Sequence, residues 1–76
     1  MYEVVKHILV GSMQVRAEDI RPAATREEIG LDSLAVQELA ALLDARLGIV
    51  VHDWELLDTV TVEDVARLVA ERKAAV

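Results

Sequence analysis

Ser33 lies between Asp32 and Leu34, shortly after Gly30 and at the start of the most regular helical pattern in the chain. The first backbone N–H groups of a helix have no partner within the helix and attract an anion. A phosphate ester on Ser33 would therefore lie at the favourable positive end of that helix. Asp32 can cap the helix and also present an acid to a basic partner, while Leu34 offers an apolar contact beside the serine. Taken alone, the Asp-Ser-Leu triplet is common and favours an ordinary helix cap that has no further role.

The helix that would present the serine is expected to span Ser33–Leu47. Its apolar residues recur at the spacing that is typical of a helix with one buried face. These residues are Val36, Leu39, Ala40, Leu43 and Leu47. Asp32 suits the N-cap position, and Gly48 suits the position just beyond the last turn. The pattern therefore places the candidate serine at the start of a well-defined helix.

Three further helical segments are expected, two long and one short. The long ones span Tyr2–Met13 and Thr61–Arg72, and the short one is a turn at Asp53–Leu57 with its first residue as the cap. Thr61 and Asp64 have the spacing of a capping box at the start of the last helix. The residues of that helix expected to be buried are Val62, Val65, Ala66 and Val69.

The segments between these helices are expected to be irregular. Gln14–Leu31 shows no helical period and forms a long loop, with Ile20 and Ile29 as its anchors in the core. Ile49–Val51 favours a strand by propensity but has no second strand to pair with, so we expect an extended link that fills the core. The sequence thus predicts an all-α fold. It is a small four-helix bundle with three main helices, one short helix and a long loop between helices 1 and 2.

The composition allows one small domain and excludes several kinds of chemistry. The chain has 76 residues, 54% of them hydrophobic, and its aromatic residues are Tyr2 and Trp54, so the core must be aliphatic. The absence of cysteine excludes a disulfide scaffold, thiolate metal sites and a cysteine nucleophile. The longest apolar run, Leu39–Leu43, is too short to cross a membrane, and Met1–Leu9 carries charge where a signal peptide would be apolar. We therefore expect a cytoplasmic protein without a membrane segment.

The charge is acidic and unevenly distributed. The net charge of −6 comes entirely from residues 25–76, which hold eleven of the 14 acids and five of the 8 basic residues. Binding of nucleic acid requires a basic face, and none can be drawn from scattered lysines and arginines. We therefore expect no nucleic-acid partner and favour a protein partner with a basic surface.

Three other features of the sequence could suggest sites. His7 and His52 with Ser33 could suggest a hydrolase triad, but the chain lacks the Gly-x-Ser-x-Gly turn and is too short for a substrate pocket with an oxyanion hole. The acids around the short helix do not match a calcium-binding loop, so we expect no metal site. Trp54 is expected to cover the core as an amphipathic lid rather than to line a cargo pocket.

The pattern around Ser33 extends over nearly the whole chain and resembles the acyl carrier protein family of fatty acid and polyketide synthesis. The similarity starts at Ile29-Gly30-Leu31-Asp32-Ser33-Leu34, includes Glu38-Leu39 and Leu47-Gly48-Ile49, and continues through Asp53 to Thr59-Val60-Thr61-Val62-Glu63-Asp64-Val65. The resemblance implies one carrier domain over residues 1–76. It also implies that Ser33, flanked by Asp32 and Leu34, is esterified by 4′-phosphopantetheine from coenzyme A.

Such a carrier catalyses nothing itself, so the resemblance implies no catalytic residue. The arm ends in a thiol that holds an acyl group as a thioester, which explains thiol chemistry in a chain without cysteine. The implied partners are a phosphopantetheinyl transferase and acyl-loading or acyl-processing enzymes such as a ketosynthase, an acyltransferase or a ligase. The implied docking residues are Leu34, Glu38 and Asp44, and we expect a monomer.

Departures from the family pattern indicate the pathway. The helix after Ser33 carries only Glu38 and Asp44 as acids, whereas carriers of fatty acid synthesis are densely acidic there. This favours polyketide or related secondary-metabolite biosynthesis. Leu31 replaces the second glycine typical of peptidyl carriers, which favours acyl over aminoacyl cargo. Arg26 stands where the loop often has an apolar anchor, so a looser loop is expected. An aminoacyl or peptidyl carrier of a nonribosomal pathway, or an unmodified helical interaction module with the same fold, remains the alternative.

Overall fold

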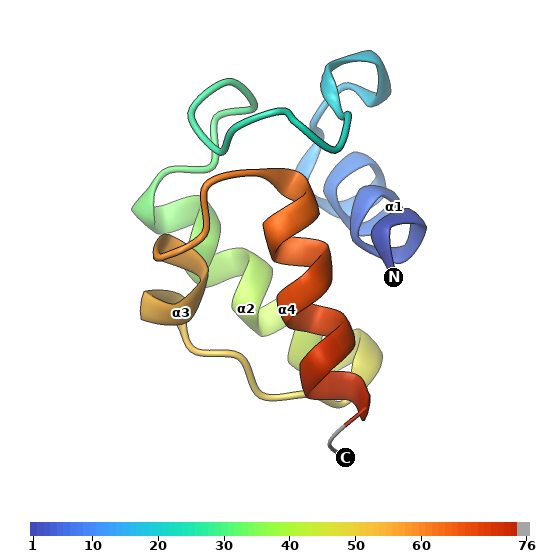
Figure 1. The fold of residues 1–76 in the computed structure, drawn as a ribbon, viewed down its shortest axis with the longest axis vertical. Helices are drawn as coiled ribbons and strands as arrows, with labels where there is room; N and C mark the ends of the chain where they lie inside the picture. The colour runs from blue at the N-terminus through green and yellow to red at the C-terminus, as the bar shows by residue number, and fades with distance from the viewer. Residues whose placement is uncertain (75–76) are drawn as a thin grey trace.

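The structure, a computed structural model, describes residues 1–74 and is built from helices joined by irregular segments (Figure 1). The elements in chain order are α1 (Tyr2–Met13), the short 3₁₀ helix η1 (Ala17–Asp19), α2 (Ser33–Leu47), α3 (Asp53–Leu57) and α4 (Val62–Ala74). Helix α1 packs against both α2 and α4, and the short α3 packs against α2. The expected all-α four-helix bundle is confirmed. The last helix begins one residue later and ends two residues later than predicted.

The helix boundaries follow local capping interactions. The Ala35 N–H donates to Asp32 Oδ1 at 2.9 Å, which makes Asp32 the N-cap of α2 as predicted. Gly48 ends α2 with a left-handed backbone (φ 66°), which glycine adopts without steric cost. Before α4, the Asp64 N–H donates to Thr61 Oγ1 at 3.2 Å and the Thr61 N–H donates back to Asp64 Oδ2 at 3.1 Å. The predicted capping box is therefore confirmed.

The cap of α3 was predicted at the wrong residue. His52, not Asp53, is the N-cap, because its backbone is extended while Asp53 already has helical geometry. The His52 N–H donates to the Glu55 carboxylate at 3.2 Å. Asp53 instead accepts a hydrogen bond from the N–H of the next residue, Trp54, at 2.9 Å.

The core is aliphatic, as the composition requires. Its buried side chains come from all four helices, from the long loop and from the link after α2. They are Val5, Ile8, Leu9, Ile20, Ala24, Leu31, Val36, Leu39, Leu43, Ile49, Val51, Leu56, Val62, Val65, Ala66 and Val69. The stripe predicted for α4 is confirmed in full, and Ile49 and Val51 confirm the core-filling link. Trp54 does not cover the core: it is 66% exposed and stacks on the His52 ring.

The long loop crosses the end of the bundle at which α2 and α4 begin (Figure 1). Its predicted anchor Ile20 is buried, but Ile29 is only half-buried, and Ala24 and Leu31 are the other buried residues of the loop. The loop also binds the start of α4, because the Val62 N–H donates to the Ala24 carbonyl at 2.9 Å. The loop thereby satisfies a backbone donor that the first turn of a helix leaves free.

Helix α3 is joined to α4 by an ion pair between Glu55 and Arg72. The Arg72 guanidinium also donates to the Val50 carbonyl at 2.6 Å. The hydrogen bond from Arg72 lowers the pKa of the Glu55 carboxyl, and the His52 backbone N–H lowers it further. Because this pKa is lower in the folded chain than in the unfolded one, the ion pair stabilises the fold fully above the unfolded value of about 4.3. Its contribution is lost as the pH falls through the lowered value.

We therefore expect Glu55→Gln to lower the melting temperature at pH 7, and the difference from the wild type to shrink below about pH 4. Circular dichroism melts from neutral to acid pH measure this difference. Glu38→Gln is the matched control, since Glu38 is exposed and forms no ion pair within residues 1–74. If Glu55→Gln lowered the melting temperature by the same amount at every pH, the result would contradict this expectation.

Candidate functional site

Ser33 is the first residue of α2, and its side chain is exposed. The preceding turn ends at Gly30, whose positive φ of 76° is a backbone conformation that side-chain-bearing residues rarely adopt. Leu31 is buried and fixes the chain to the core two residues before the serine. Asp32 and Leu34 flank the serine and are exposed, Leu34 at 76%. The structure therefore places all three residues of the predicted attachment motif together at one accessible helix start.

A hollow of about 400 Å³ lies beside the serine. It is lined by Arg26, Glu27, Gly30, Leu31, Asp32, Ser33 and Leu57. Its walls come from the long loop, the first turn of α2 and the last residue of α3. A serine that lies both exposed and at the rim of a hollow has room for a group larger than its own side chain.

The three predicted docking residues are all exposed on α2 but do not form one row. At about 100° of rotation per residue, Glu38 lies about 40° to one side of Leu34 and Asp44 about 80° to the other side. The exposed residues Ala41 and Ala45 fall between the two acids. Leu34, Ala41 and Ala45 thus form an apolar strip along α2, and one acid stands on each flank.

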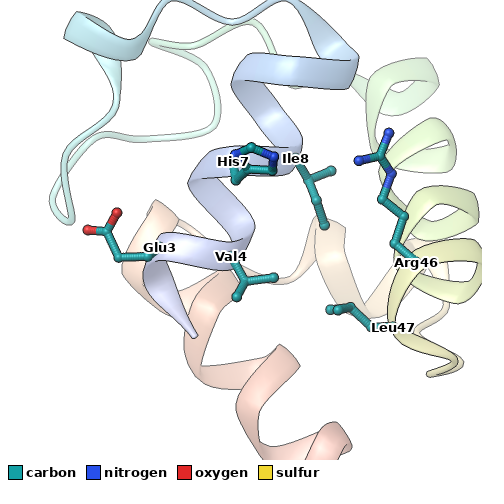
Figure 2. A pocket seen from close by; sticks show the side chains of 6 residues that line it. All are labelled: Glu3, Val4, His7, Ile8, Arg46 and Leu47. Atoms are coloured by element: carbon teal, nitrogen blue, oxygen red, sulfur yellow. The ribbon is translucent and has the colours of Figure 1, made fainter.

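A second hollow, of about 280 Å³, lies between α1 and the C-terminal half of α2 (Figure 2). It is lined by Glu3, Val4, His7, Ile8, Arg46 and Leu47. Arg46 is thirteen residues along α2 from Ser33, a distance of about 20 Å at 1.5 Å per residue. His7 therefore lies toward the far end of α2, and His52 is stacked on Trp54. The arrangement gives no support to the hydrolase triad, and no cluster of metal-ligating side chains occurs in residues 1–74.

Arg26 is a residue whose importance the sequence did not indicate. Its guanidinium donates to three backbone carbonyls, those of Leu31 (3.1 Å), Leu57 (2.9 Å) and Thr59 (2.9 Å). The expectation that an arginine at this position loosens the loop is wrong. A planar guanidinium with five N–H groups can join several carbonyls at once, which an apolar side chain cannot do. No spacing pattern reveals such contacts, because they join segments about thirty residues apart.

Known proteins with similar sequences show the family of this chain. The family model described as "Phosphopantetheine attachment site" matches residues 3–69, which is most of the chain. This chain belongs to the acyl carrier protein family. The acyl carrier protein of Wolinella succinogenes is 30% identical to this carrier over 96% of its length and 97% of the relative. The acyl carrier protein of Petrotoga mobilis is 27% identical over 95% of this chain and 86% of the relative. That of Nitratidesulfovibrio vulgaris is 29% identical over 93% of this chain and 95% of the relative.

The protein is therefore a carrier and not itself an enzyme, and the family's prosthetic group is 4′-phosphopantetheine. Carriers of this family work with the enzymes that modify them and with enzymes that process acyl groups. When bound, the arm supplies the thiol that the chain lacks and carries the acyl group as a thioester. The exposed hydroxyl of Ser33 and the hollow beside it fit a group of this kind. Within residues 1–74, no helix has the length and apolar character needed to cross a bilayer.

Proposed function

We propose that Ser33 carries the phosphopantetheine arm and that residues 1–76 form one carrier domain. The observation that carries this proposal is the exposed position of Ser33 at the first turn of α2, on the rim of the 400 Å³ hollow. The Ser33 oxygen would lose its proton and form an ester bond to the phosphorus on the pantetheine side of the coenzyme A pyrophosphate. The phosphoanhydride bond would break, and adenosine 3′,5′-bisphosphate would leave. The resulting phosphodiester lies at the N-terminus of α2, where backbone N–H groups favour an anion.

The residues that flank Ser33 have separate parts in this proposal. Asp32 accepts the Ala35 N–H through Oδ1 and so fixes the first turn that presents the hydroxyl. Leu34 projects beside the serine as an apolar contact for the enzymes that bind there. The partners that we propose are a phosphopantetheinyl transferase and, after it, a ketosynthase, an acyltransferase or a ligase, met in the cytoplasm by a monomeric carrier.

We further propose that the cargo is an acyl group of polyketide or related secondary-metabolite biosynthesis. The support is the sparse charge of α2, whose two acids stand on either side of an apolar strip instead of forming a dense acidic row. Leu31 also favours this assignment over that of a peptidyl carrier. Its side chain is buried in the core, a role that glycine cannot fill.

Intact-mass measurement tests the proposal directly. The purified chain is incubated with coenzyme A and a phosphopantetheinyl transferase, and we expect the mass to rise by one arm. No gain of mass would favour an unmodified helical interaction module. The armed carrier is then offered to an acyltransferase with an acyl donor and to an adenylating enzyme with amino acids. Loading by the acyltransferase alone supports acyl cargo, and loading by the adenylating enzyme alone overturns it.

We expect reversal of the two acids on α2 to slow association with partner enzymes. Glu38 and Asp44 are exposed and outside any ion pair in residues 1–74, so they act by attracting a basic surface before contact. At low salt, Glu38→Lys with Asp44→Lys is expected to reduce the association rate about tenfold, and high salt to remove most of the difference. Stopped-flow binding to the transferase measures this rate.

The matched control is Glu3→Lys with Glu71→Lys, which changes the net charge equally at exposed acids on α1 and α4. This control is expected to associate much faster than the α2 variant. Equal slowing in both variants would show that only the net charge matters. It would remove the case for docking at α2.

A further inference from the structure

The Arg26 guanidinium joins the segment before Ser33 to the segment that leaves α3. Nη1 donates to the Leu31 carbonyl, Nη2 to the Leu57 carbonyl and Nε to the Thr59 carbonyl, at 2.9–3.1 Å. We propose that Arg26 is a positioning residue for arm attachment. It holds Ser33 at a fixed place relative to the end of α3, so that the modifying enzyme meets a preformed site. This inference rests on the proposed role of Ser33.

The backbone of Arg26 adds two hydrogen bonds to the same connection. Its N–H donates to the Val60 carbonyl at 3.1 Å, and its carbonyl accepts the Leu31 N–H at 2.9 Å. One residue therefore makes five hydrogen bonds to the two segments that meet at the hollow. Leu31 is held through both its N–H and its carbonyl, two residues before the serine.

The partners of Arg26 distinguish it from most other arginines of the chain. Arg16, Arg21, Arg67 and Arg72 each pair with a carboxylate. Arg26 has no ion pair within residues 1–74, and its side chain binds only carbonyl oxygens. Its role is thus geometric, because the planar guanidinium fixes the directions of its hydrogen bonds. A lysine keeps the charge but presents its three donors from one nitrogen, so it does not hold all three carbonyls.

The hollow beside Ser33 relates the contacts of Arg26 to the attachment of the arm. Arg26, Leu31, Ser33 and Leu57 all line it, so two of the three residues whose carbonyls Arg26 joins, Leu31 and Leu57, lie around the proposed attachment site. Transfer to a hydroxyl depends steeply on the position of the oxygen, and small displacements cost large factors in rate. The apolar strip on α2 makes none of the hydrogen bonds to Arg26. Loss of the guanidinium is therefore expected to impair the transfer step more than the binding of the enzyme.

The test uses Arg26→Met and steady-state kinetics of arm attachment by the transferase. Methionine keeps an unbranched apolar stem and removes all three side-chain hydrogen bonds. We expect kcat to fall about tenfold and KM to stay within about twofold, because docking is preserved while the hydroxyl is misplaced. Arg26→Lys is expected to recover part of kcat. The matched control is Arg21→Met, the same change at an exposed arginine of the same loop, which should retain the wild-type kcat.

A merely structural role predicts a different result. If Arg26 only stabilises the fold, its loss lowers the folded fraction, which raises the apparent KM and leaves kcat unchanged. That result would overturn the inference, as would loss of the helical circular dichroism signal in both Arg26 variants. If the wild-type chain takes up the arm and Arg26→Met keeps its kcat, only this inference fails. If the wild-type chain takes up no arm, the proposed function fails and the inference fails with it.

Discussion

Ser33→Ala is expected to abolish addition of the arm and to leave the helical circular dichroism spectrum nearly unchanged. The Ser33 hydroxyl is the proposed acceptor, and alanine has none to offer. The cap of α2 does not depend on this side chain, because Asp32 Oδ1 accepts the Ala35 N–H. Alanine is also the most favourable residue within a helix, so the first turn is retained. Intact mass after incubation with coenzyme A and the transferase measures the loss.

Ser12→Ala is the matched control, since Ser12 and Ser33 are the two serines of the chain. Ser12 lies in the last turn of α1, and its Oγ accepts a hydrogen bond from Arg46. This variant should gain the full mass of the arm. An arm on Ser33→Ala, or loss of the arm from a folded Ser12→Ala, would show that the attachment site is assigned to the wrong residue.

Leu39→Ala is expected to unfold much of the population, whereas Leu34→Ala leaves stability almost unchanged. Leu39 is 0% exposed in the centre of α2, so its truncation leaves a cavity and costs about 2–5 kcal/mol. A core in a chain of this length rarely supplies more than about 3–5 kcal/mol, so this loss removes most of the stability. Urea unfolding followed by circular dichroism measures the free energy of unfolding of both variants.

The same leucine-to-alanine change at position 34 separates docking from folding. Leu34 is 76% exposed, so alanine there leaves no cavity and removes only the apolar contact offered beside Ser33. We expect a wild-type urea midpoint together with a KM for arm attachment that rises several-fold. Equal destabilisation of the two variants would mean that Leu34 is part of the core. An unchanged KM would remove it from the docking surface.

Local residue patterns were enough to predict the four helices and the position of the candidate serine at the start of one of them. Apolar spacing in Ser33–Leu47 and in the last helix predicted the buried faces, because a helix repeats every 3.6 residues whatever surrounds it. Asp32, Gly48 and the Thr61–Asp64 box set helix ends through interactions with residues only a few positions away. Such local signals depend only on residues close together in the sequence, and the motif around Ser33 is one of them.

The segments around the serine are held by contacts that form only in the folded chain. Arg26 was expected to loosen the loop, but the fold brings Leu57 and Thr59 within reach of its guanidinium. Trp54 was expected to cover the core, but α3 is a single turn whose buried position is taken by Leu56, so the indole faces solvent and stacks on His52. Both outcomes depend on contacts between residues that meet in space because the bundle closes. The periodic spacing of apolar residues does not predict such contacts.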